Sequence, residues 1–237
     1  MSVFRFKQFS VEQEQSPAKI TTDATVFAAS LQIPPNGKRV LEIGTGTGVL
    51  SLMLAQRYPE IEIDALEIYP IAFEVADLNF KNSPWNARLK AVLADFNQFK
   101  SDIQYDVIFS NPPFFQNNLQ SERNHGKNTA YHTNDLSFKA LAKGIDLNLT
   151  KNGESHIMLP LFEMSLFEKE MIAIGFQCKR SVELRHQPES KIIRFFNVFE
   201  KGEGKQSTDK QLIIVRDENH DFHPSYINLM KDFLTIF

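Results

Sequence analysis

The sequence has little of several features that mark special classes of protein. It contains one cysteine, Cys178, in 237 residues, which excludes a disulfide framework and a metal site built from several cysteines. No stretch approaches the roughly 20 consecutive apolar residues that a transmembrane helix needs. Residues 1–10 also lack the apolar segment of a signal peptide. We therefore expect a cytoplasmic protein that is not attached to a membrane.

The sequence also lacks a strong excess of charge of either sign. It has 26 Lys and Arg against 29 Asp and Glu, which gives a net charge of -3. A general nucleic-acid binder usually has a basic surface, so this balance argues mildly against that class but leaves room for a local basic patch. Hydrophobic residues make up 42% and charged residues 23%, which is ordinary for a globular protein and excludes disorder as the main state.

Short β-branched segments alternate with helical segments through the middle of the chain. The helical spacing appears at residues 50–57, 71–79, 136–149 and 161–174. The segments that read as strands are residues 39–43, 61–66, 89–93, 105–109 and 155–159. Strands and helices that alternate in this way predict a parallel sheet with helices on both faces.

After Gly175 the pattern changes to strands without helices between them. These strands are predicted at residues 178–185, 192–199 and 211–215, and they suggest an antiparallel edge on the parallel sheet. Helices are expected at 21–31, with Thr21 or Thr22 as the N-cap, and at 224–237. The predicted fold class is a doubly wound α/β fold with a mostly parallel, seven-stranded sheet. We expect one domain over residues 1–237, with a hairpin and helix in 1–38, a core in 39–175 and the antiparallel edge in 176–237.

A glycine-rich turn follows the strand at 39–43 and opens a helix. In Glu42-Ile43-Gly44-Thr45-Gly46-Thr47-Gly48 the spacing is G-x-G-x-G, not the G-x-G-x-x-G of dinucleotide sites. Glycine permits positive φ and a close approach of the backbone to a ligand. The amides at the following helix N-terminus attract anionic or polar groups. Such a turn favours ligand binding but is a weak signal alone.

Three acidic residues strengthen that signal. Glu42 precedes the first glycine by two positions, Glu67 ends the next strand, and Asp95 follows the third strand. All three lie at predicted carboxyl ends of strands, where open α/β sheets bind their ligands. An acid at the end of the second strand reaches a pair of ribose hydroxyls in such folds.

Over about residues 39–160 these features resemble the class I S-adenosylmethionine-dependent methyltransferases. The resemblance implies a Rossmann-like methyltransferase fold and S-adenosyl-L-methionine as the cofactor. Gly44, Gly46 and Gly48 would then pack against its methionine moiety and ribose. Glu42 would orient the methionine ammonium or the loop.

The same resemblance implies an adenosine-binding set. Glu67 would hold the ribose hydroxyls, Asp95 would bind the adenine amino group, and Phe96 would flank the adenine ring.

The most informative stretch is Ser110-Asn111-Pro112-Pro113-Phe114-Phe115, which follows the fourth predicted strand. The two prolines stiffen the backbone and lack N–H donors, and the first of them pushes Asn111 toward an extended conformation. The turn thus presents two acceptors, the Asn111 side-chain oxygen and the Pro112 carbonyl, beside the ring of Phe114. Two such acceptors suit a planar NH2 group, which has two hydrogens to donate and can stack on the ring.

This stretch matches the N-P-P-[YF] signature of methyltransferases that act on planar nitrogens, namely adenine N6, cytosine N4, guanine N2 and protein glutamine. The match implies in-line methyl transfer without a metal or a covalent intermediate. Catalysis would be mostly positioning, with hydrogen bonds matched to the charge that develops on nitrogen. Asn111, Pro112 and Phe114 would be catalytic, and Asn111 would also border the cofactor. A base in a folded nucleic acid would have to flip out to reach the turn.

Nearly the whole chain resembles one family, the bacterial tRNA1(Val) adenine N6-methyltransferases. The shared features are an N-terminal hairpin, the glycine loop, the Asn-Pro-Pro-Phe turn and a tail that contains Lys231-Asp232-Phe233. The resemblance implies methylation of the adenine just 3′ of the anticodon, position 37, in tRNA1(Val). Lys19 and Asp23 match the family's Lys-Val-Gly-Thr-Asp stretch, although Thr21 and Ala24 replace its glycines.

Two segments have a positive local balance that suits phosphate contacts: residues 176–201 with six basic and three acidic residues, and residues 121–143 with four and two. The loop after the Asn-Pro-Pro-Phe turn must border the substrate. Arg123 and Lys127 in this loop and Phe115 in the turn are therefore predicted to bind the substrate. The resemblance to the family implies Lys19 and Asp23 as two further substrate-binding residues. His220 and His223 have metal-like spacing but no carboxylate or cysteine partner, so we expect no metal site.

Three other hypotheses stay open from the sequence. Protein glutamine N5-methylation is one, although those enzymes usually carry a larger N-terminal helical domain than the residues before the glycine loop allow. Methylation of guanine N2 in rRNA is another. The third is a binding module that has lost its chemistry, and the intact glycine loop, acidic residues and Asn-Pro-Pro-Phe turn argue against it.

Overall fold

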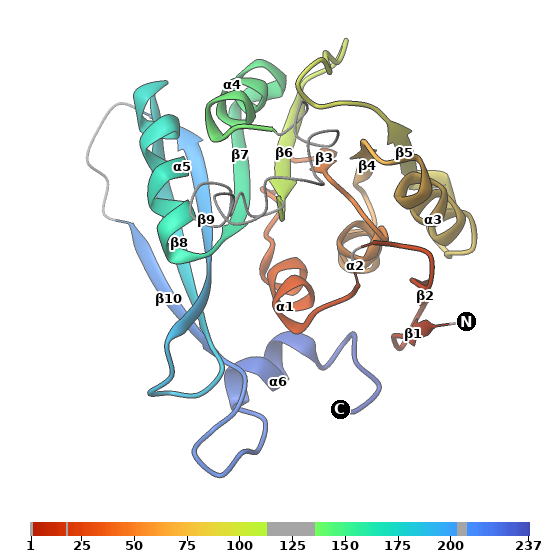
Figure 1. Cartoon of the computed structure of the whole chain (residues 1–237), viewed down its shortest axis with the longest axis vertical. Helices are drawn as coiled ribbons and strands as arrows, with labels where there is room; N and C mark the ends of the chain where they lie inside the picture. Colours follow the sequence, from red (N-terminus) through yellow and green to blue (C-terminus); the bar gives the residue numbers. More distant parts are fainter. Residues whose placement is uncertain (1, 18, 113–135, 203–207) are drawn as a thin grey trace, which may run out of the picture.

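The computed structural model describes residues 2–17, 19–112, 136–202 and 208–237. Its main sheet has eight strands in the order β10-β8-β9-β7-β6-β3-β4-β5 (Figure 1). Their bounds are β3 Arg39–Ile43, β4 Glu62–Glu67, β5 Leu89–Leu93, β6 Tyr105–Ser110, β7 Leu149–Leu159, β8 Phe176–Arg185, β9 Ile192–Lys201 and β10 Asp209–Ile214. All eight predicted strand segments are found in this sheet, so the predicted count of seven is wrong.

The strand directions confirm a mostly parallel sheet. Strands β5, β4, β3, β6 and β7 are parallel, and β9 is antiparallel to both β7 and β8. The outermost strand, β10, is parallel to β8 and so departs from the expected antiparallel edge. The chain reverses direction after β9 and returns on the far side of β8, and for this reason β10 takes the direction of β8.

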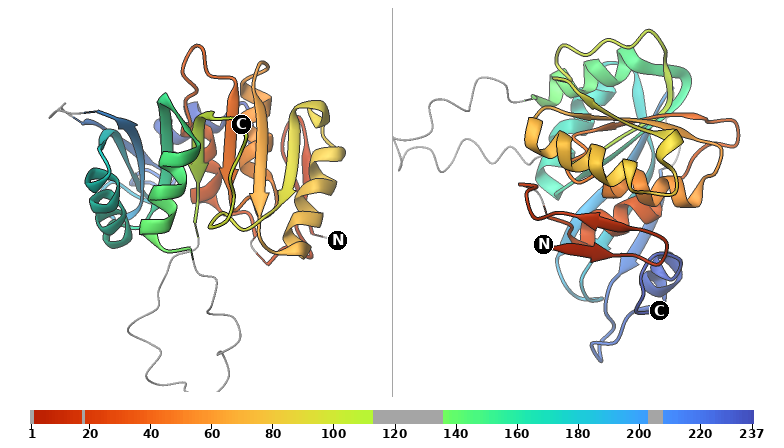
Figure 2. Two further views of the ribbon diagram at one scale, coloured as in Figure 1. Left: turned by 90° about the horizontal axis from the view of Figure 1, so that it is seen from above. Right: turned by 90° about the vertical axis from the view of Figure 1, so that its right-hand side faces the viewer.

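Helices cover both faces of the sheet, as a doubly wound fold requires (Figure 2). The first core contains apolar residues of α1 (Thr22–Ser30), α2 (Val49–Arg57), α3 (Pro70–Lys81) and α6 (Pro224–Met230). The second core contains those of α4 (Phe138–Asn148) and α5 (Leu161–Ala173). A short 3-10 helix, η1, spans Asn86–Arg88. None of the described helices is long and apolar enough to cross a membrane.

Two helix ends test the local predictions. The N-cap of α1 is Thr21, whose hydroxyl accepts a hydrogen bond from the N–H of Ala24 at 3.4 Å, so this predicted cap is confirmed. The C-terminal helix is shorter than predicted and ends at Met230, although Phe233 and Leu234 beyond it are still buried.

The strand directions place the functional segments at one edge of the sheet. We call the edge at which β3, β4, β5, β6 and β7 end the carboxyl edge. Because Leu159 at the end of β7 pairs with Phe195 near the start of β9, and Arg185 at the end of β8 pairs with Ile192, the turn between β8 and β9 also lies there. The glycine loop, Asn111 and this turn therefore share one edge.

The N-terminal hairpin, β1 (Val3–Arg5) with β2 (Ser10–Glu12), is tied to this arrangement by a buried amide. The side chain of Asn79 in α3 donates to the carbonyls of Glu12 at 2.9 Å and Thr47 at 2.8 Å, and accepts from the N–H of Glu12 at 2.8 Å. The hairpin also meets the C-terminal segment, since the N–H of Lys7 donates to the carbonyl of Phe233 at 2.8 Å. Asn79 thus joins the hairpin to the glycine loop.

Replacing Asn79 with alanine removes three hydrogen bonds and leaves buried backbone groups without partners. We expect the free energy of unfolding to fall by roughly 2–3 kcal/mol, measured by urea denaturation. The matched control is Asn82→Ala at the exposed end of the same helix, which should stay within about 0.5 kcal/mol of the parent protein. Equal losses in the two variants would contradict the bridging role of Asn79.

Candidate functional site

The glycine loop has the backbone conformation that its sequence predicts. Gly44, Gly46 and Gly48 have φ values of 73°, 58° and 80°. A Cβ added at Gly44 would meet no atom of the described residues within 4 Å, so these residues leave space in front of this part of the loop. A Cβ at Gly48 would lie 2.5 Å from Cε1 of Phe80, so the close packing of α3 also requires glycine there. The loop therefore exposes backbone without side chains at Gly44, whereas at Gly48 it packs closely against Phe80 of α3.

Glu67 organises this loop through three backbone amides. Its Oε2 accepts from the N–H of Gly46 at 2.9 Å, and its Oε1 accepts from those of Ile68 at 2.9 Å and Tyr69 at 3.0 Å. A carboxylate has about four acceptor positions, so one remains for a ligand hydroxyl. Its predicted contact with ribose stays a prediction. The role in holding the loop was not expected from the sequence, because it depends on where β3 and β4 end in space.

Glu42 is fully buried beneath the loop. Its Oε2 accepts from the hydroxyls of Thr45, at 2.7 Å, and Ser51 in α2. Its Oε1 is buried and has no hydrogen-bond partner among the described residues. Burial raises the pKa of Glu42 from 4.5 to about 7, against the opposing effect of the two hydroxyl donors. The negative charge of nearby Glu67 raises this pKa further. The carboxyl group can therefore exchange a proton near neutral pH.

Asp95 and Phe96 follow β5 at the same edge. The carboxylate of Asp95 is partly exposed and accepts from the N–H of Asn97 at 2.9 Å. Phe96 is buried in the second core, where it stacks on Phe99 and lies so close to α4 that a Cβ at Gly144 would be 2.5 Å from its ring. Because the ring is already packed between protein groups, its predicted contact with adenine stays a prediction.

The structure brings Asn111 next to the glycine loop. Ser110 pairs with Ile43, and its hydroxyl donates to the carbonyl of Ile43 at 2.8 Å. Asn111 and Gly44 follow these two residues on strands that lie about 4.8 Å apart. Asn111 is partly exposed, and among the described residues no hydrogen bond engages its side-chain amide. Pro112 is buried beside it.

Four predicted site residues, Phe114, Phe115, Arg123 and Lys127, lie outside the described residues, and nothing further is said of their placement. The other two predicted substrate-binding residues are described and make contacts within the chain. Lys19 donates through Nζ to the carbonyls of Gln13 and Glu14, the latter at 2.8 Å. The carboxylate of Asp23 forms an ion pair with Nε of Arg194 at 2.9 Å. Their contacts with substrate stay predictions.

The basic residues of the segment 176–201 do not gather at one place. Lys179 and Lys201 lie near the start of β8 and the end of β9, whereas Arg185 and Arg194 lie at the carboxyl edge. Each of these four residues forms an ion pair with an acidic side chain. The pairs are Lys179 with Glu154 and Glu200, Arg185 with Glu183, Arg194 with Asp23, and Lys201 with Asp146. The local charge balance therefore does not translate into one phosphate-binding surface.

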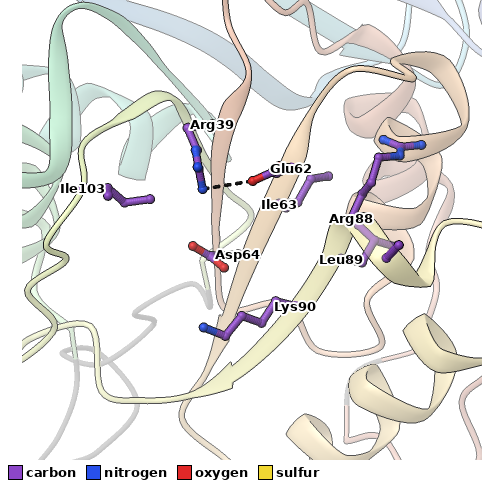
Figure 3. Close-up of a pocket in the computed structure, with 9 residues that line it drawn as sticks. Arg39, Glu62, Ile63, Asp64, Arg88, Leu89, Lys90 and Ile103 are labelled. Atoms are coloured by element: carbon purple, nitrogen blue, oxygen red, sulfur yellow. Dashed lines mark ion pairs between the residues drawn. The ribbon is translucent and has the colours of Figure 1, made fainter.

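A cavity of about 330 Å³ lies at the opposite edge of the sheet, where β3, β4 and β5 begin (Figure 3). Figure 3 shows Arg39 directed toward Glu62, with an N–O distance of 3.0 Å. The carboxylate of Asp64, which also lines this cavity, accepts from the hydroxyl of Tyr105 at 2.8 Å. Arg39 and Glu62 thus pair with each other, Asp64 is hydrogen-bonded to Tyr105, and the glycine loop is at the other edge, so the carboxyl edge is the better candidate site.

The two histidines with metal-like spacing have other contacts. Nδ1 of His220 lies 3.2 Å from Nε2 of Gln187, and His223 caps α6 by accepting from the N–H of Ser225. Within the part of the chain that the structure describes, no three His, Cys, Asp or Glu side chains are grouped as metal ligands.

The raised pKa of Glu42 gives stability a specific pH dependence. Between pH 4.5 and about 7 the folded protein binds the proton of Glu42 more tightly than the unfolded chain, so this contribution to stability is full below pH 4.5 and is lost as the pH rises through 7. Glu42→Gln removes the titration. Relative to the parent protein, we expect its free energy of unfolding to gain up to about 3 kcal/mol across this range, measured by urea denaturation at several pH values.

Ser51→Ala provides a second check on Glu42. The hydroxyl of Ser51 lowers the pKa of Glu42, so its removal should shift the loss of stability to higher pH. A Glu42→Gln variant with the pH profile of the parent protein would show that Glu42 does not titrate in this range.

Comparison with protein families and solved structures identifies the class of this chain. The methyltransferase small domain family matches residues 16–135. Among solved structures, a predicted O-methyltransferase from Agrobacterium tumefaciens has a TM-score of 0.65 at 16% identity, covering 88% of this chain and 95% of that one. A methyltransferase from Pyrococcus furiosus has a TM-score of 0.59 at 21% identity, covering 81% and 90%. At these identities the structures establish the Rossmann-like methyltransferase fold alone.

Curated relatives match over nearly the full length. The tRNA1(Val) (adenine(37)-N6)-methyltransferase of Dyadobacter fermentans is 37% identical over 97% of this chain and 96% of its own length. The enzyme of the same name from Vibrio vulnificus is 32% identical over 97% of this chain and 94% of its own. With this extent of similarity, and with a glycine loop and an Asn111-Pro112 segment that meet at the carboxyl edge, the chain belongs to the tRNA1(Val) (adenine(37)-N6)-methyltransferase family.

Proposed function

We propose that this protein transfers a methyl group from S-adenosylmethionine to N6 of adenine 37 in tRNA1(Val). The observation that carries the proposal is the similarity to enzymes of that name along almost the whole chain, at 37% identity for the Dyadobacter fermentans enzyme. S-adenosylmethionine is the cofactor that membership of the methyltransferase family implies. A protein that acts on bacterial tRNA would work in the cytoplasm, and residues 1–237 would act as one methyltransferase domain.

The residues at the carboxyl edge fit this cofactor. Among the described residues, the space in front of Gly44, which a Cβ would enter, leaves room for a ligand against the bare backbone. The buried Oε1 of Glu42 lacks a partner among the described residues, and a methionine ammonium is the kind of donor it requires. Glu42, Gly44, Gly46, Gly48, Glu67 and Asp95 would hold the cofactor. When bound, it supplies a methyl group already activated by the sulfonium.

The protein's own contribution to the reaction is to bind and orient the amine. The Asn111 side-chain oxygen and the Pro112 carbonyl each accept one hydrogen of the adenine NH2 group, which directs the nitrogen lone pair away from both. These hydrogen bonds strengthen as positive charge develops on nitrogen during transfer. Methyl transfer leaves a positive charge on the nitrogen, which then loses one of its two protons. Asn111 is not a strong base, so this proton passes to water. The stacking of adenine on Phe114 is proposed from the sequence motif.

Product identification tests the function directly. The protein is incubated with labelled S-adenosylmethionine and total tRNA, rRNA or release factor, and the digested products are separated. We expect N6-methyladenosine in tRNA, and a tRNA1(Val) transcript with adenine 37 replaced by guanine should accept no label. Label confined to protein, or to guanine in rRNA, would overturn the proposal in favour of another planar nitrogen.

Asn111→Ala should separate catalysis from cofactor binding. The variant loses an acceptor that orients the amine, so we expect kcat to fall roughly 100-fold or more while the cofactor Kd stays within about twofold. Turnover is measured with tRNA and Kd by calorimetry. Asn152→Ala, at an exposed asparagine near the start of β7, is the matched control and should behave as the parent protein. An equal loss of cofactor affinity in Asn111→Ala would show that this residue serves binding instead.

Glu67→Ala should have the opposite effect. It removes the acceptor for the amides of Gly46, Ile68 and Tyr69 together with the proposed ribose contact. We expect the cofactor Kd to rise roughly 10- to 100-fold, with a smaller change in kcat at saturating cofactor. Glu62→Ala, at the exposed start of the same strand, is the control. Unchanged cofactor affinity in Glu67→Ala would exclude the proposed role of this carboxylate.

A further inference from the structure

A separate cavity of about 400 Å³ lies at the carboxyl edge. It is lined by residues from the start of α1, the end of β8, the start of β9 and the segment that leads into α6. Its apolar wall is formed by Leu184 of β8, Val215 after β10 and Tyr226 of α6, all of which are buried. Its volume is in the range of sites that bind small organic ligands. Figure 1 shows α6 close to the turn between β8 and β9.

One side of this cavity carries a stack of flat groups. The rings of Phe222 and Tyr226 are nearly parallel, at an interplanar angle of 16° and a centroid distance of 5.3 Å. The guanidinium of Arg216 lies 3.7 Å from the centroid of Phe222, and its Nη1 donates to the carbonyl of His220 at 2.9 Å, which holds the group in place. Both Phe222 and Arg216 line the cavity. Stacked aromatic rings and an arginine plane are what unpaired RNA bases stack on.

A hydrogen-bond acceptor from another element, α1, also lines the cavity. Asp23 lines the cavity, and its side chain is 15% exposed. One carboxylate oxygen accepts from the N–H of Ala24 at 3.1 Å, and the other pairs with Nε of Arg194 at 2.9 Å. Since an ionised carboxylate has about four acceptor positions, Asp23 retains the capacity to accept from an N–H edge presented within the cavity.

The cavity is positioned beside the proposed methylation site. Asn111 follows β6, and the strands that continue from there are β7, β9 and β8 in that order. Leu184 and Ile193, which line the cavity, therefore lie two to three strand spacings across the sheet from β6, on the order of 10–15 Å in that direction and at the same edge. A ligand in this cavity and an adenine held at Asn111 can belong to the same short stretch of RNA.

We propose that this cavity binds a second, unpaired nucleobase of the RNA substrate, close in sequence to the methylated adenine. The base stacks against the guanidinium plane of Arg216, which the Phe222 ring supports from behind, and directs an N–H donor at the carboxylate of Asp23. This inference rests on the proposed function, because it requires an RNA substrate at Asn111. It assigns recognition of a flanking nucleotide to the side of the sheet formed by β8, β9 and α6.

The test is a set of protein variants measured against RNAs that lack one base. Anticodon stem-loops of tRNA1(Val) are made with an abasic site at each loop position in turn, and binding is measured by fluorescence anisotropy in the presence of S-adenosylhomocysteine. For the parent protein, one abasic position other than adenine 37 should weaken binding roughly tenfold, as expected for the loss of one stacked base.

Two variants locate that base in the cavity. Phe222→Leu keeps apolar volume but removes the ring that supports the Arg216 guanidinium plane. Asp23→Asn keeps the shape of the side chain but replaces one acceptor with a donor. In both, we expect weaker binding of the intact stem-loop and a much smaller further loss at the sensitive abasic position. Thermal denaturation and the cofactor Kd verify that the variants are folded.

The ion pair of Asp23 supplies a matched control. Arg194→Gln breaks the same pair but leaves the Asp23 carboxylate in place, so the tenfold loss at the sensitive position should persist.

The proposal is overturned if no flanking position is sensitive, or if the loss is the same in the parent, Phe222→Leu and Asp23→Asn proteins. If the parent protein neither binds nor methylates tRNA, the proposed function itself is wrong and the cavity proposal falls with it. If the protein methylates tRNA normally but shows neither a sensitive flanking position nor an effect of the two variants, only the cavity proposal is rejected.

Discussion

The carboxylate of Glu67 accepts hydrogen bonds from the N–H groups of Gly46, Ile68 and Tyr69, and the position of the segments at the candidate site depends on this contact. The first amide belongs to the glycine loop, and the other two belong to the segment that starts α3. Parallel strands end at the same edge, but nothing in the strand ladder fixes how the loops beyond them are arranged. The buried carboxylate of Glu67 fixes this arrangement because it accepts hydrogen bonds from both loops. Hydrogen bonds to a charged acceptor are stronger than those between neutral groups.

Beneath this loop the carboxyl group of Glu42 is fully buried, which is energetically unfavourable for a group that can carry a charge. A fully buried carboxyl group with one unpartnered oxygen is costly, and its pKa of about 7 reflects that cost. Apolar residues of similar size would pack better in a purely structural role. Unsatisfied buried groups and strongly shifted pKa values are found most often at functional sites. The combination of Glu42 below the loop and the space at Gly44 above it is the arrangement that the proposed cofactor, with its cationic ammonium group, would complete.

The sequence predicted the features that depend on local pattern. Strands, the Thr21 cap and the glycine loop follow from periodicity, capping chemistry and the need for positive φ, all of which are encoded within a few residues. Contacts between distant segments were not predictable in this way. The pairing of Asp23 with Arg194, the burial of Phe96 against Gly144 and the place of β10 beside β8 all depend on strand order and register. The same dependence explains why basic residues adjacent in sequence are divided between two edges of the sheet.

The ranges of the family matches bear on where substrate selection resides. The methyltransferase small domain match ends at residue 135, and it includes the glycine loop, Glu67, Asp95 and Asn111. The relatives in the tRNA1(Val) (adenine(37)-N6)-methyltransferase family align with about 97% of the chain. Most of the residues that line the carboxyl-edge cavity, from Leu184 to Tyr226, therefore lie in the part that these relatives share and the general domain match does not cover. Under the proposed function, the methyl donor and the target nitrogen would meet within the first part. Choice among RNAs needs contacts beyond the target base, and the proposed nucleobase cavity would supply such a contact from the second part, at the same edge, on strands that continue the sheet next to Asn111.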